Sequence, residues 1–228
     1  MASSSETKQE YGALLFGPQA LNFDIHDFQK LRHQLRETPS HRWAIEAVAS
    51  LPETWCNLIE HIPDFRHLNG QKLLNKLVDG IRDGPIDPSL FPLPNFLLSP
   101  LVVIIHLTQY WEFRRSSLPD LADTNVLPPS STKTLETIGL CTGMLSAFAA
   151  SSSPSLAKLE QNGATAVRLA MLVGALVDAE DKSVDSHGKS VSFSVSWSGS
   201  ESDSELKKVL KRYPEVRETA QSLSTLNY

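Results

Sequence analysis

The sequence predicts an α/β protein in which helices surround a short, mostly parallel β-sheet. Its 228 residues suffice for one medium-sized domain with a hydrophobic core, and its 41% hydrophobic and 21% charged residues are ordinary for a globular protein. Short apolar runs that end in glycine-containing turns alternate with longer stretches in which apolar residues recur every three or four positions. This alternation of strand and helix patterns is typical of α/β folds.

Five stretches carry the helical pattern, and they span residues 24–35, 40–62, 70–81, 96–113 and 155–179. Pro52 lies inside the second stretch, which predicts either a kink or a break into two helices. The fourth stretch is apolar on all sides at its start and ends in Arg114 and Arg115, which is typical of a buried helix that reaches the surface. Surface loops are expected over residues 85–94, 116–133 and 181–189.

The strands are expected at three places. An apolar run over residues 12–16 predicts a buried strand, and a second buried strand is expected over 135–140, before the turn at Cys141. Strict alternation of apolar residues with serine over 190–198 predicts a strand with one solvent-exposed face. A short helix over residues 202–210 follows the third strand. The polar leader 1–11 is expected to be disordered, so the predicted domain spans residues 12–228.

Charge, cysteine content and apolar run length argue against several other classes of protein. A net charge of −5 provides no general attraction to nucleic acid, and residues 1–10 lack the apolar core of a signal peptide. The apolar run over 96–107 is shorter than the roughly 20 residues that cross a bilayer. Cys56 and Cys141 lie far apart and form no C-x-x-C motif. We therefore expect a cytoplasmic protein with no membrane span, no nucleic-acid partner, no disulfide and no metal site.

Cys141 lies in the motif that carries the most chemical information. The segment Gly139-Leu140-Cys141-Thr142-Gly143 is G-x-C-x-G, a cysteine version of the nucleophile elbow, in which a nucleophile occupies a sharp turn between a strand and a helix. The two glycines let the strand and the helix approach closely around the turn. The side chain of Cys141 then projects above the sheet, and the backbone amide of Thr142 can point at a developing oxyanion.

Three motifs, in this order, resemble the starter unit:acyl carrier protein transacylase (SAT) domain of fungal non-reducing iterative polyketide synthases. They are Phe16-Gly17-Pro18-Gln19, the segment Leu98-Ser99-Pro100-Leu101-Val102-Val103-Ile104-Ile105-His106, and the segment Ile138-Gly139-Leu140-Cys141-Thr142-Gly143-Met144-Leu145-Ser146-Ala147. The resemblance runs from about Leu14 to the end of the chain. It implies a malonyl-transacylase-like, α/β-hydrolase-like large subdomain with helices around a short sheet.

The resemblance also implies an acyl transfer in two steps. Cys141 would take an acyl group from an acyl thioester, either acyl-CoA or a donor derived from a fatty acid synthase, and pass it to the phosphopantetheine thiol of an acyl carrier protein. Gln19 matches the position whose backbone amide, together with that of Thr142, forms the oxyanion hole in this family. No cofactor is expected to be bound by the domain itself.

Val173 is the position at which we expect selectivity for the acyl group. Related malonyl transacylases carry a serine nucleophile and, downstream, an arginine directly before a glycine that pairs with the malonyl carboxylate. Alignment of residues 166–174 places Val173 there, before Gly174. Valine cannot pair with a carboxylate, so an acetyl or longer uncharged starter fits better than malonyl.

The family's general base, a histidine, has no clear match in this sequence. The family's catalytic histidine lies beyond a small ferredoxin-like subdomain, and the chain stops at Tyr228, about where that subdomain should begin. His187 is the histidine that follows Cys141, but it lies in a polar loop unlike the family motif. The sequence therefore predicts a large subdomain without its small partner, and impaired turnover.

Two other functions stay open. One is an inactive relic that binds acyl groups or a carrier protein, and the other is a cysteine thioesterase or hydrolase, for which no acid and histidine follow in the required order. Cys56 is expected in the core, and the basic helix ends at Arg114-Arg115 and 207–212 are candidate docking points for an acidic carrier protein. Glu60, His61, Asp64 and His67 do not have the spacing of a standard metal site.

Overall fold

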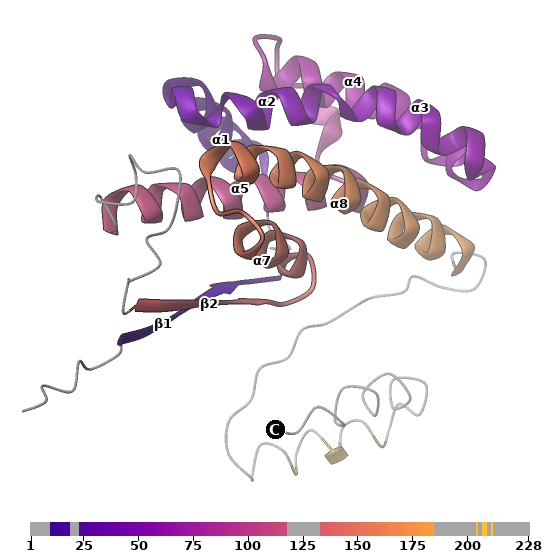
Figure 1. The fold of residues 1–228 in the computed structure, drawn as a ribbon. Helices are drawn as coiled ribbons and strands as arrows, with labels where there is room; N and C mark the ends of the chain where they lie inside the picture. Colours follow the sequence, from indigo (N-terminus) through magenta and orange to yellow (C-terminus); the bar gives the residue numbers. More distant parts are fainter. Residues whose placement is uncertain are drawn as a thin grey trace, which may run out of the picture. The chain divides into compact units, whose positions relative to one another are not determined.

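A computed structural model of the chain describes residues 10–18, 23–117 and 133–184, together with residues 204, 207, 208 and 211. The chain divides into two units, Met1–Gly188 and Lys189–Tyr228. The first unit is mostly helical and contains a two-stranded parallel sheet (Figure 1). It thus agrees with the predicted α/β class, and helices make up most of its described residues.

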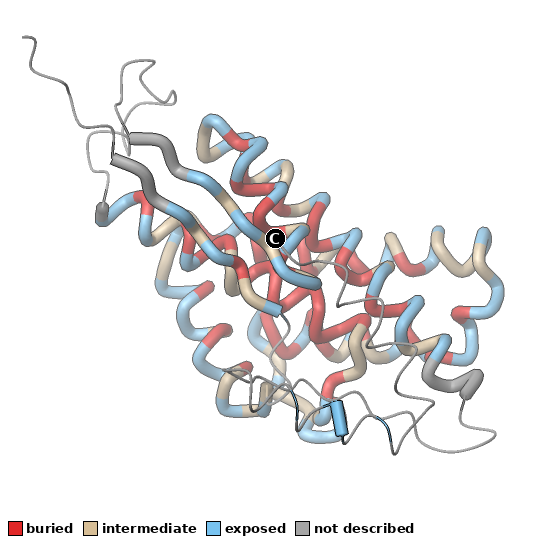
Figure 2. The backbone as a smooth tube through the Cα atoms, turned by 90° about the horizontal axis from the view of Figure 1, so that it is seen from below, coloured by how far each residue is buried: buried red, intermediate tan, exposed pale blue. Residues whose placement is uncertain are grey.

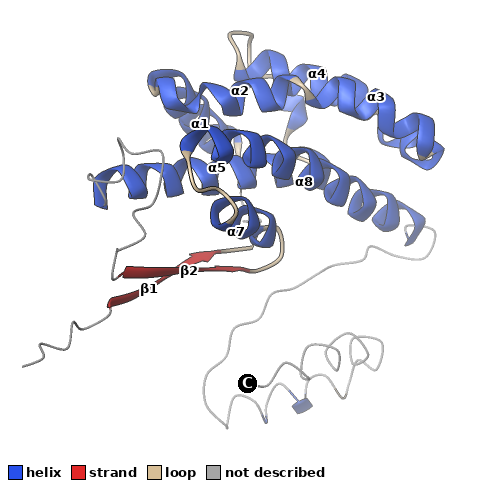
Figure 3. Cartoon of the chain, viewed as in Figure 1, coloured by secondary structure: helices blue, strands red, loops and turns tan. Residues whose placement is uncertain are grey.

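The helices of the first unit follow one another in the order seen in Figure 3. They are α1 (Ile25–Glu37), η1 (Pro39–His41), α2 (Arg42–Ala49), α3 (Leu51–His61), η2 (Pro63–Leu68), α4 (Gly70–Ile81), η3 (Pro88–Leu90), α5 (Asn95–Ser117), α7 (Gly143–Ser151) and α8 (Leu156–Val184). The stretch with Pro52 forms two helices, α2 and α3, which confirms one of the two expected outcomes. Pro52 lies in the first turn of α3, where proline's missing amide hydrogen is tolerated.

Two carboxylates define where helices α1 and α5 begin. Asp24 caps α1, because its side chain accepts hydrogen bonds from the amides of His26 and Asp27, and the Asp27 side chain accepts from the Asp24 amide. Asp178, on α8, caps α5 instead, since its two oxygens accept from the amides at residues 95 and 96. The start of α5 is therefore tied to α8.

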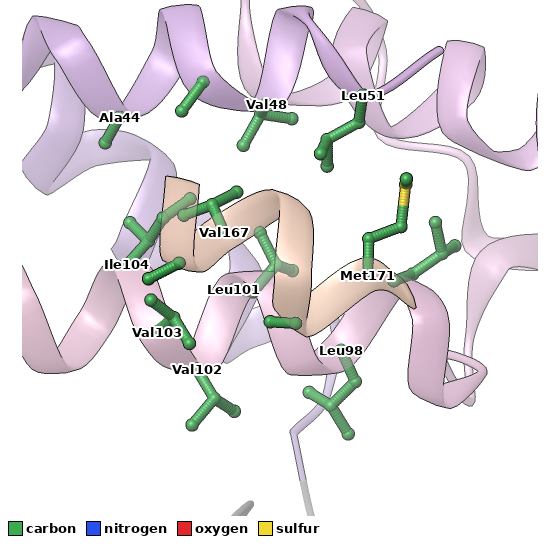
Figure 4. Packing of buried hydrophobic residues seen from close by; sticks show 14 of the residues in the cluster. Ala44, Val48, Leu51, Leu98, Leu101, Val102, Val103, Ile104, Val167 and Met171 are labelled. Carbon is green, nitrogen blue, oxygen red and sulfur yellow. The ribbon is translucent and has the colours of Figure 1, made fainter. Parts of the chain in front are cut away.

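The hydrophobic core lies where α5 and α8 cross and where α2 and α3 cover them. Figure 4 shows α8 between α2 and α3 on one side and α5 on the other. The side chains that meet there are Ala44, Val48, Leu51, Leu98, Leu101, Val102, Val103, Ile104, Val167 and Met171. Trp55 adds aromatic contacts, because its ring lies 5.9 Å from that of Phe65 and 5.1 Å from that of Phe96.

Two helices in the described part of the chain are long and apolar enough to cross a membrane by length and composition. They are Asn95–Ser116 and Leu156–Glu180, and the first exceeds the apolar run that the sequence analysis considered. The apolar window of the first helix is 67% buried, as is typical of the core helix of a soluble protein. The apolar composition of this helix is thus accounted for by its place in the core.

Strands β1 (Glu10–Phe16) and β2 (Lys133–Gly139) pair in parallel, with Glu10 opposite Lys133 and Phe16 opposite Gly139. Helix α7 packs against this sheet on one side and against α5 and α8 on the other, and α5 also contacts the end of β1 at Phe16 (Figure 1). Both strands begin two residues earlier than expected and β2 ends one residue earlier. The described part of the sheet has an open face, so the expectation of buried strands is wrong (Figure 2).

The boundaries of other elements also differ from expectation. Helix α8 continues through residues 181–184, which were expected to be a loop. Within the expected leader 1–11, residues 10 and 11 belong to β1, and residues 1–9 lie outside the described residues. The expected loop over 116–133 and the strand over 190–198 also fall mostly or wholly outside them. In the second unit Ser204, Lys207 and Lys208 are helical, where the sequence predicts a helix.

Candidate functional site

Cys141 lies at the sharp turn between β2 and α7, as the G-x-C-x-G pattern predicts. Its backbone has a φ angle of 55°, in the left-handed region that few residues other than glycine adopt. The amide of Leu140 donates to the carbonyl of Phe16 at 3.0 Å, which extends the parallel pairing to the residue before the turn. The strained turn thus connects strand and helix directly at the cysteine.

The two glycines of the motif allow the close approach of strand, turn and helix. A Cβ atom on Gly139 would lie 2.5 Å from the Gly143 carbonyl oxygen and 2.6 Å from the Met144 amide nitrogen. A Cβ atom on Gly143 would overlap the carbonyl oxygen of Phe16 and lie 2.5 Å from that of Gly17. No other residue type fits at either position without a movement of the backbone, because each neighbour is itself backbone.

The amide of Thr142 is available at the turn. The amides of Gly143, Met144 and Leu145 donate to the carbonyls of Leu140, Cys141 and Thr142 at 3.0, 3.0 and 3.2 Å. No hydrogen-bond acceptor for the Thr142 amide is found among the described residues. The Cys141 thiol is exposed, and its sulfur lies 3.9 Å from the Thr142 hydroxyl oxygen. An accessible nucleophile and an unused amide donor are therefore adjacent in the chain.

Beneath the turn lies a polar contact that the sequence analysis did not predict. Nδ1 of His106, on α5, lies 3.1 Å from the hydroxyl oxygen of Ser146, which is fully buried on α7. The His106 ring also meets the ring of Phe16 edge to face at 5.7 Å. Burial of the imidazole lowers the pKa of His106, so the ring is neutral at neutral pH. His106 thus contacts both the end of β1 and the helix that follows Cys141.

Strands β1 and β2, the turn and helix α7 carry apolar side chains that are unusually exposed. Leu15 is 73% exposed and Phe148 77% exposed, and both would be buried in an ordinary core. Other exposed apolar residues of the same three elements and of the turn are Ile138, Leu140 and Met144. Leu140 and Met144 are the two of these residues that lie closest to Cys141 in the chain, and their exposed side chains are suited to apolar contacts.

Several residues that the sequence singled out lie elsewhere. Gln19 and His187 lie outside the described residues, so their expected roles stay predictions. Val173 is about half exposed, on α8 rather than on the turn. Arg114 is buried, with its guanidinium 5.8 Å from the centre of the Tyr110 ring, so only Arg115 of this pair is exposed for docking.

The second cysteine differs from expectation. Cys56 is exposed, not in the core, and its thiol donates to Oε1 of Gln71 at 3.0 Å. The neighbouring Trp55 occupies the buried side of α3, and Cys56 lies about 100° further around the helix. Among the described residues, no group of three or more His, Cys, Asp or Glu side chains could hold a metal ion.

Comparison with known families gives a match over residues 93–225 to the model described as "Starter unit:ACP transacylase in aflatoxin biosynthesis". The matched region contains α5, β2, the Cys141 turn, α7 and α8. It therefore includes the whole of the turn whose geometry is described above.

Comparison with characterised proteins gives matches to fungal polyketide synthases. The chain is 49% identical to clavatol synthase claF of Penicillium crustosum over 215 residues, which are 94% of this chain and 8% of that protein. It is 44% identical to citrinin polyketide synthase of Monascus ruber, over 93% of this chain and 8% of that protein. It is 43% identical to non-reducing polyketide synthase AC of Didymella fabae, over 89% of this chain and 8% of that protein. The chain thus spans about one twelfth of the length of these relatives.

Proposed function

Because the chain belongs to the starter unit:ACP transacylase family, we propose that it transfers a starter acyl group onto an acyl carrier protein in fungal polyketide biosynthesis. The observation that supports this most strongly is the turn at Cys141, where an exposed thiol stands beside a backbone amide that donates to no described acceptor. Such an arrangement suits nucleophilic attack on a thioester.

In the first step the Cys141 sulfur attacks the carbonyl carbon of an acyl thioester. A carbon–sulfur bond forms, and the carbonyl oxygen becomes an oxyanion that accepts a hydrogen bond from the Thr142 amide. Collapse of this intermediate breaks the bond to the leaving thiol, which takes the proton that Cys141 gave up. The products are an acylated Cys141 and a free thiol, either CoA or the pantetheine arm of a donor derived from a fatty acid synthase.

In the second step the phosphopantetheine thiol of the carrier protein attacks the Cys141 thioester. The same amide stabilises the second oxyanion, and collapse releases Cys141 and leaves the acyl group on the carrier. Gln19 would supply the second amide of the oxyanion hole, because it matches the position that has this role in the family. No cofactor is bound in this scheme, since both thioesters are substrates.

The acyl group that fits best is uncharged. Val173 has no positive charge to pair with a malonyl carboxylate, and the exposed apolar side chains of Leu140 and Met144, close to Cys141 in the chain, favour an alkyl chain. An acetyl or longer acyl chain is therefore the proposed starter. The finer proposals that accompany this role are a malonyl-transacylase-like large subdomain over residues 12–228 and a cytoplasmic location.

The proposed function is tested by intact mass spectrometry after the full chain is mixed with hexanoyl-CoA. We expect one hexanoyl adduct, lost in Cys141→Ala and kept in the matched Cys56→Ala variant, which removes the other exposed thiol. Malonyl-CoA should load much more slowly than hexanoyl-CoA. An adduct on Cys56, or no adduct on the parent chain, would contradict the proposal.

A further inference from the structure

The face of α7 that packs against the rest of the protein is made of small residues. Its buried members are Gly143, Ser146, Ala147, Ala149 and Ala150. Leu145 is half-buried, whereas the large side chains of Met144 and Phe148 are exposed. A smooth face of this kind permits close approach. Because few large side chains interlock with neighbouring helices, packing alone does little to fix the position of α7 along its axis.

Polar contacts therefore contribute to fixing α7 along its axis, and they occur at both ends. At the end nearer Cys141, the Ser146 hydroxyl lies 3.1 Å from Nδ1 of His106. At the far end, Nδ2 of Asn162 donates to the Ser152 carbonyl and to the hydroxyls of Ser152 and Ser153, at 3.0 to 3.2 Å. Among the buried residues of α7, Ser146 is the one with a side-chain hydrogen-bonding group.

We propose that His106 is a positioning residue, which holds the Cys141 turn in register through its contacts with Ser146 and Phe16. The inference rests on the proposed acyl transfer, because positioning matters only if Cys141 reacts. The carbonyl of Phe16 accepts the hydrogen bond from Leu140, and Gly143 packs against that same carbonyl. His106 thus contacts the strand on one side of the turn and the helix on the other.

The reason that a remote contact affects the chemistry is geometric. The Thr142 amide must lie within hydrogen-bond distance of an oxyanion formed at the Cys141 sulfur. A displacement of about 1 Å in such a site reduces the rate by up to about a hundredfold. A slide of α7 relative to β1 would move both Cys141 and Thr142 away from the end of β1, where the second proposed amide is expected.

The test uses the full chain in a Cys56→Ser background, so that Cys141 is the one remaining thiol. The variants are His106→Leu, Ser146→Ala, the double variant of these two, His106→Asn and the control Asn162→Ala. Asparagine can place a hydrogen-bonding atom where Nδ1 of histidine lies, whereas leucine cannot. The two readouts are the rate of hexanoyl adduct formation and the amide NMR shifts of Thr142 and Gly143.

We expect His106→Leu and Ser146→Ala each to slow adduct formation about tenfold, and the double variant to be no slower than either single variant, because both remove one interaction. His106→Asn should stay within about threefold of the parent. Asn162→Ala removes the polar contacts at the end of α7 away from Cys141, so it should slow adduct formation and move the two amide shifts much less than His106→Leu does. Multiplicative losses in the double variant, no rescue by asparagine, or an equal loss in Asn162→Ala would overturn the proposal.

The two readouts separate the failure of this inference from that of the proposed function. If the parent forms no adduct, acyl transfer by this chain is wrong, while the amide shifts still report whether His106 holds the turn. Should the parent form the adduct and His106→Leu change neither its rate nor the shifts, the positioning role is wrong and the acyl transfer stands.

Discussion

The helical part of the molecule, α1 to α5 with α8, and the elbow part, β1, β2 and α7, are built in different ways. In the helical part large side chains such as Trp55, Phe65 and Leu101 are almost completely buried. In the elbow part the buried residues are mostly glycine, alanine and serine, and large side chains such as Phe148 are exposed. Figure 2 shows this contrast between the buried helices and the exposed sheet.

This difference indicates that the helical part supplies most of the stability and the elbow part holds the proposed site. Burial of large apolar side chains supplies most of the free energy of folding, so the helical part is the stable scaffold. The elbow part buries fewer large side chains and instead has close contacts between backbone atoms. These contacts place Cys141 and the Thr142 amide at an accessible turn. The proposed site therefore lies where side-chain packing contributes least to stability.

The largest expected effect contrasts the same substitution in the two parts. Phe65→Ala removes a ring that is 1% exposed and stacked on Trp55, so we expect a loss of about 3 to 5 kcal/mol in the free energy of unfolding. Phe148→Ala, at a ring 77% exposed, should change it by less than about 0.5 kcal/mol. Urea unfolding measures both. Similar losses in the two variants would contradict the inference that the helical part supplies most of the stability.

A second contrast uses glycine-to-alanine substitutions, which should lower the stability in the elbow part and raise it in the helical part. Gly143→Ala places a methyl group against backbone oxygens of Phe16 and Gly17, and we expect it to destabilise the chain by about 1 to 3 kcal/mol and to abolish acylation of Cys141. Gly80→Ala, inside α4, meets the Phe28 ring at 3.4 Å, an ordinary contact.

Gly80→Ala should therefore stabilise the chain by about 0.5 to 1 kcal/mol, because alanine loses less backbone entropy than glycine in a helix. Thermal unfolding of both variants, with intact mass after hexanoyl-CoA, measures the pair. A Gly143→Ala chain that acylates normally would show that the close approach of α7 to β1 is not required.

The sequence predicted those features of both parts whose signals lie within a short segment of the chain. The turn at Cys141 follows from two glycines that flank a residue between a strand pattern and a helix pattern, and the break between α2 and α3 follows from Pro52. Helix boundaries for α1 and α4 agree within about two residues, because capping and glycine signals lie in the same short segments.

What the sequence did not predict depends on contacts between distant residues. A strand pattern such as 135–140 carries no information on whether another layer covers it, so the exposure of Ile138 was not foreseen. The contact of His106 with Ser146 joins residues 40 positions apart. A histidine in an otherwise apolar helix was the one available signal, since a buried polar group needs a partner.

A third prediction tests whether polar contacts also hold the helical part together. The carboxylate of Asp178 accepts from the Asn95 and Phe96 amides at 3.1 and 2.9 Å, and from the Asn95 side chain at 2.8 Å. We expect Asp178→Ala to cost about 1 to 2 kcal/mol of stability and Asp178→Asn to cost less, because an amide oxygen still accepts.

The matched control is Asp83→Ala, which removes a highly exposed carboxylate paired with Arg36 at 2.9 Å. An exposed pair of this kind contributes less than about 1 kcal/mol. Chemical denaturation of the three variants gives the comparison. If Asp178→Ala and Asp83→Ala lower the free energy of unfolding by the same small amount, the link between α8 and the start of α5 adds nothing to the stability of the helical part.

The smallest expected effect is a pH dependence that arises from His41, which is fully buried at the start of α2. Burial lowers the pKa of this imidazole, and Glu112, whose Oε1 lies 3.3 Å from Nε2, opposes the shift only in part. The unfolded chain therefore binds a proton at higher pH than the folded chain does. Its contribution to stability is complete above the unfolded pKa of about 6.5 and is lost as the pH falls toward the lowered folded value.

Below pH 6.5 we expect His41 to reduce the free energy of unfolding by up to about 1.4 kcal/mol for each pH unit, within the interval between the two pKa values. His41→Leu should flatten this part of the profile, whereas Glu112→Gln should extend the loss to lower pH, because it removes the charge that raises the pKa of His41. Denaturant unfolding from pH 8 to pH 5 measures the three profiles. A parent and a His41→Leu chain with the same slope would assign the acid sensitivity to other groups. The next group to test is the half-buried His106 on α5, since burial lowers its pKa as well.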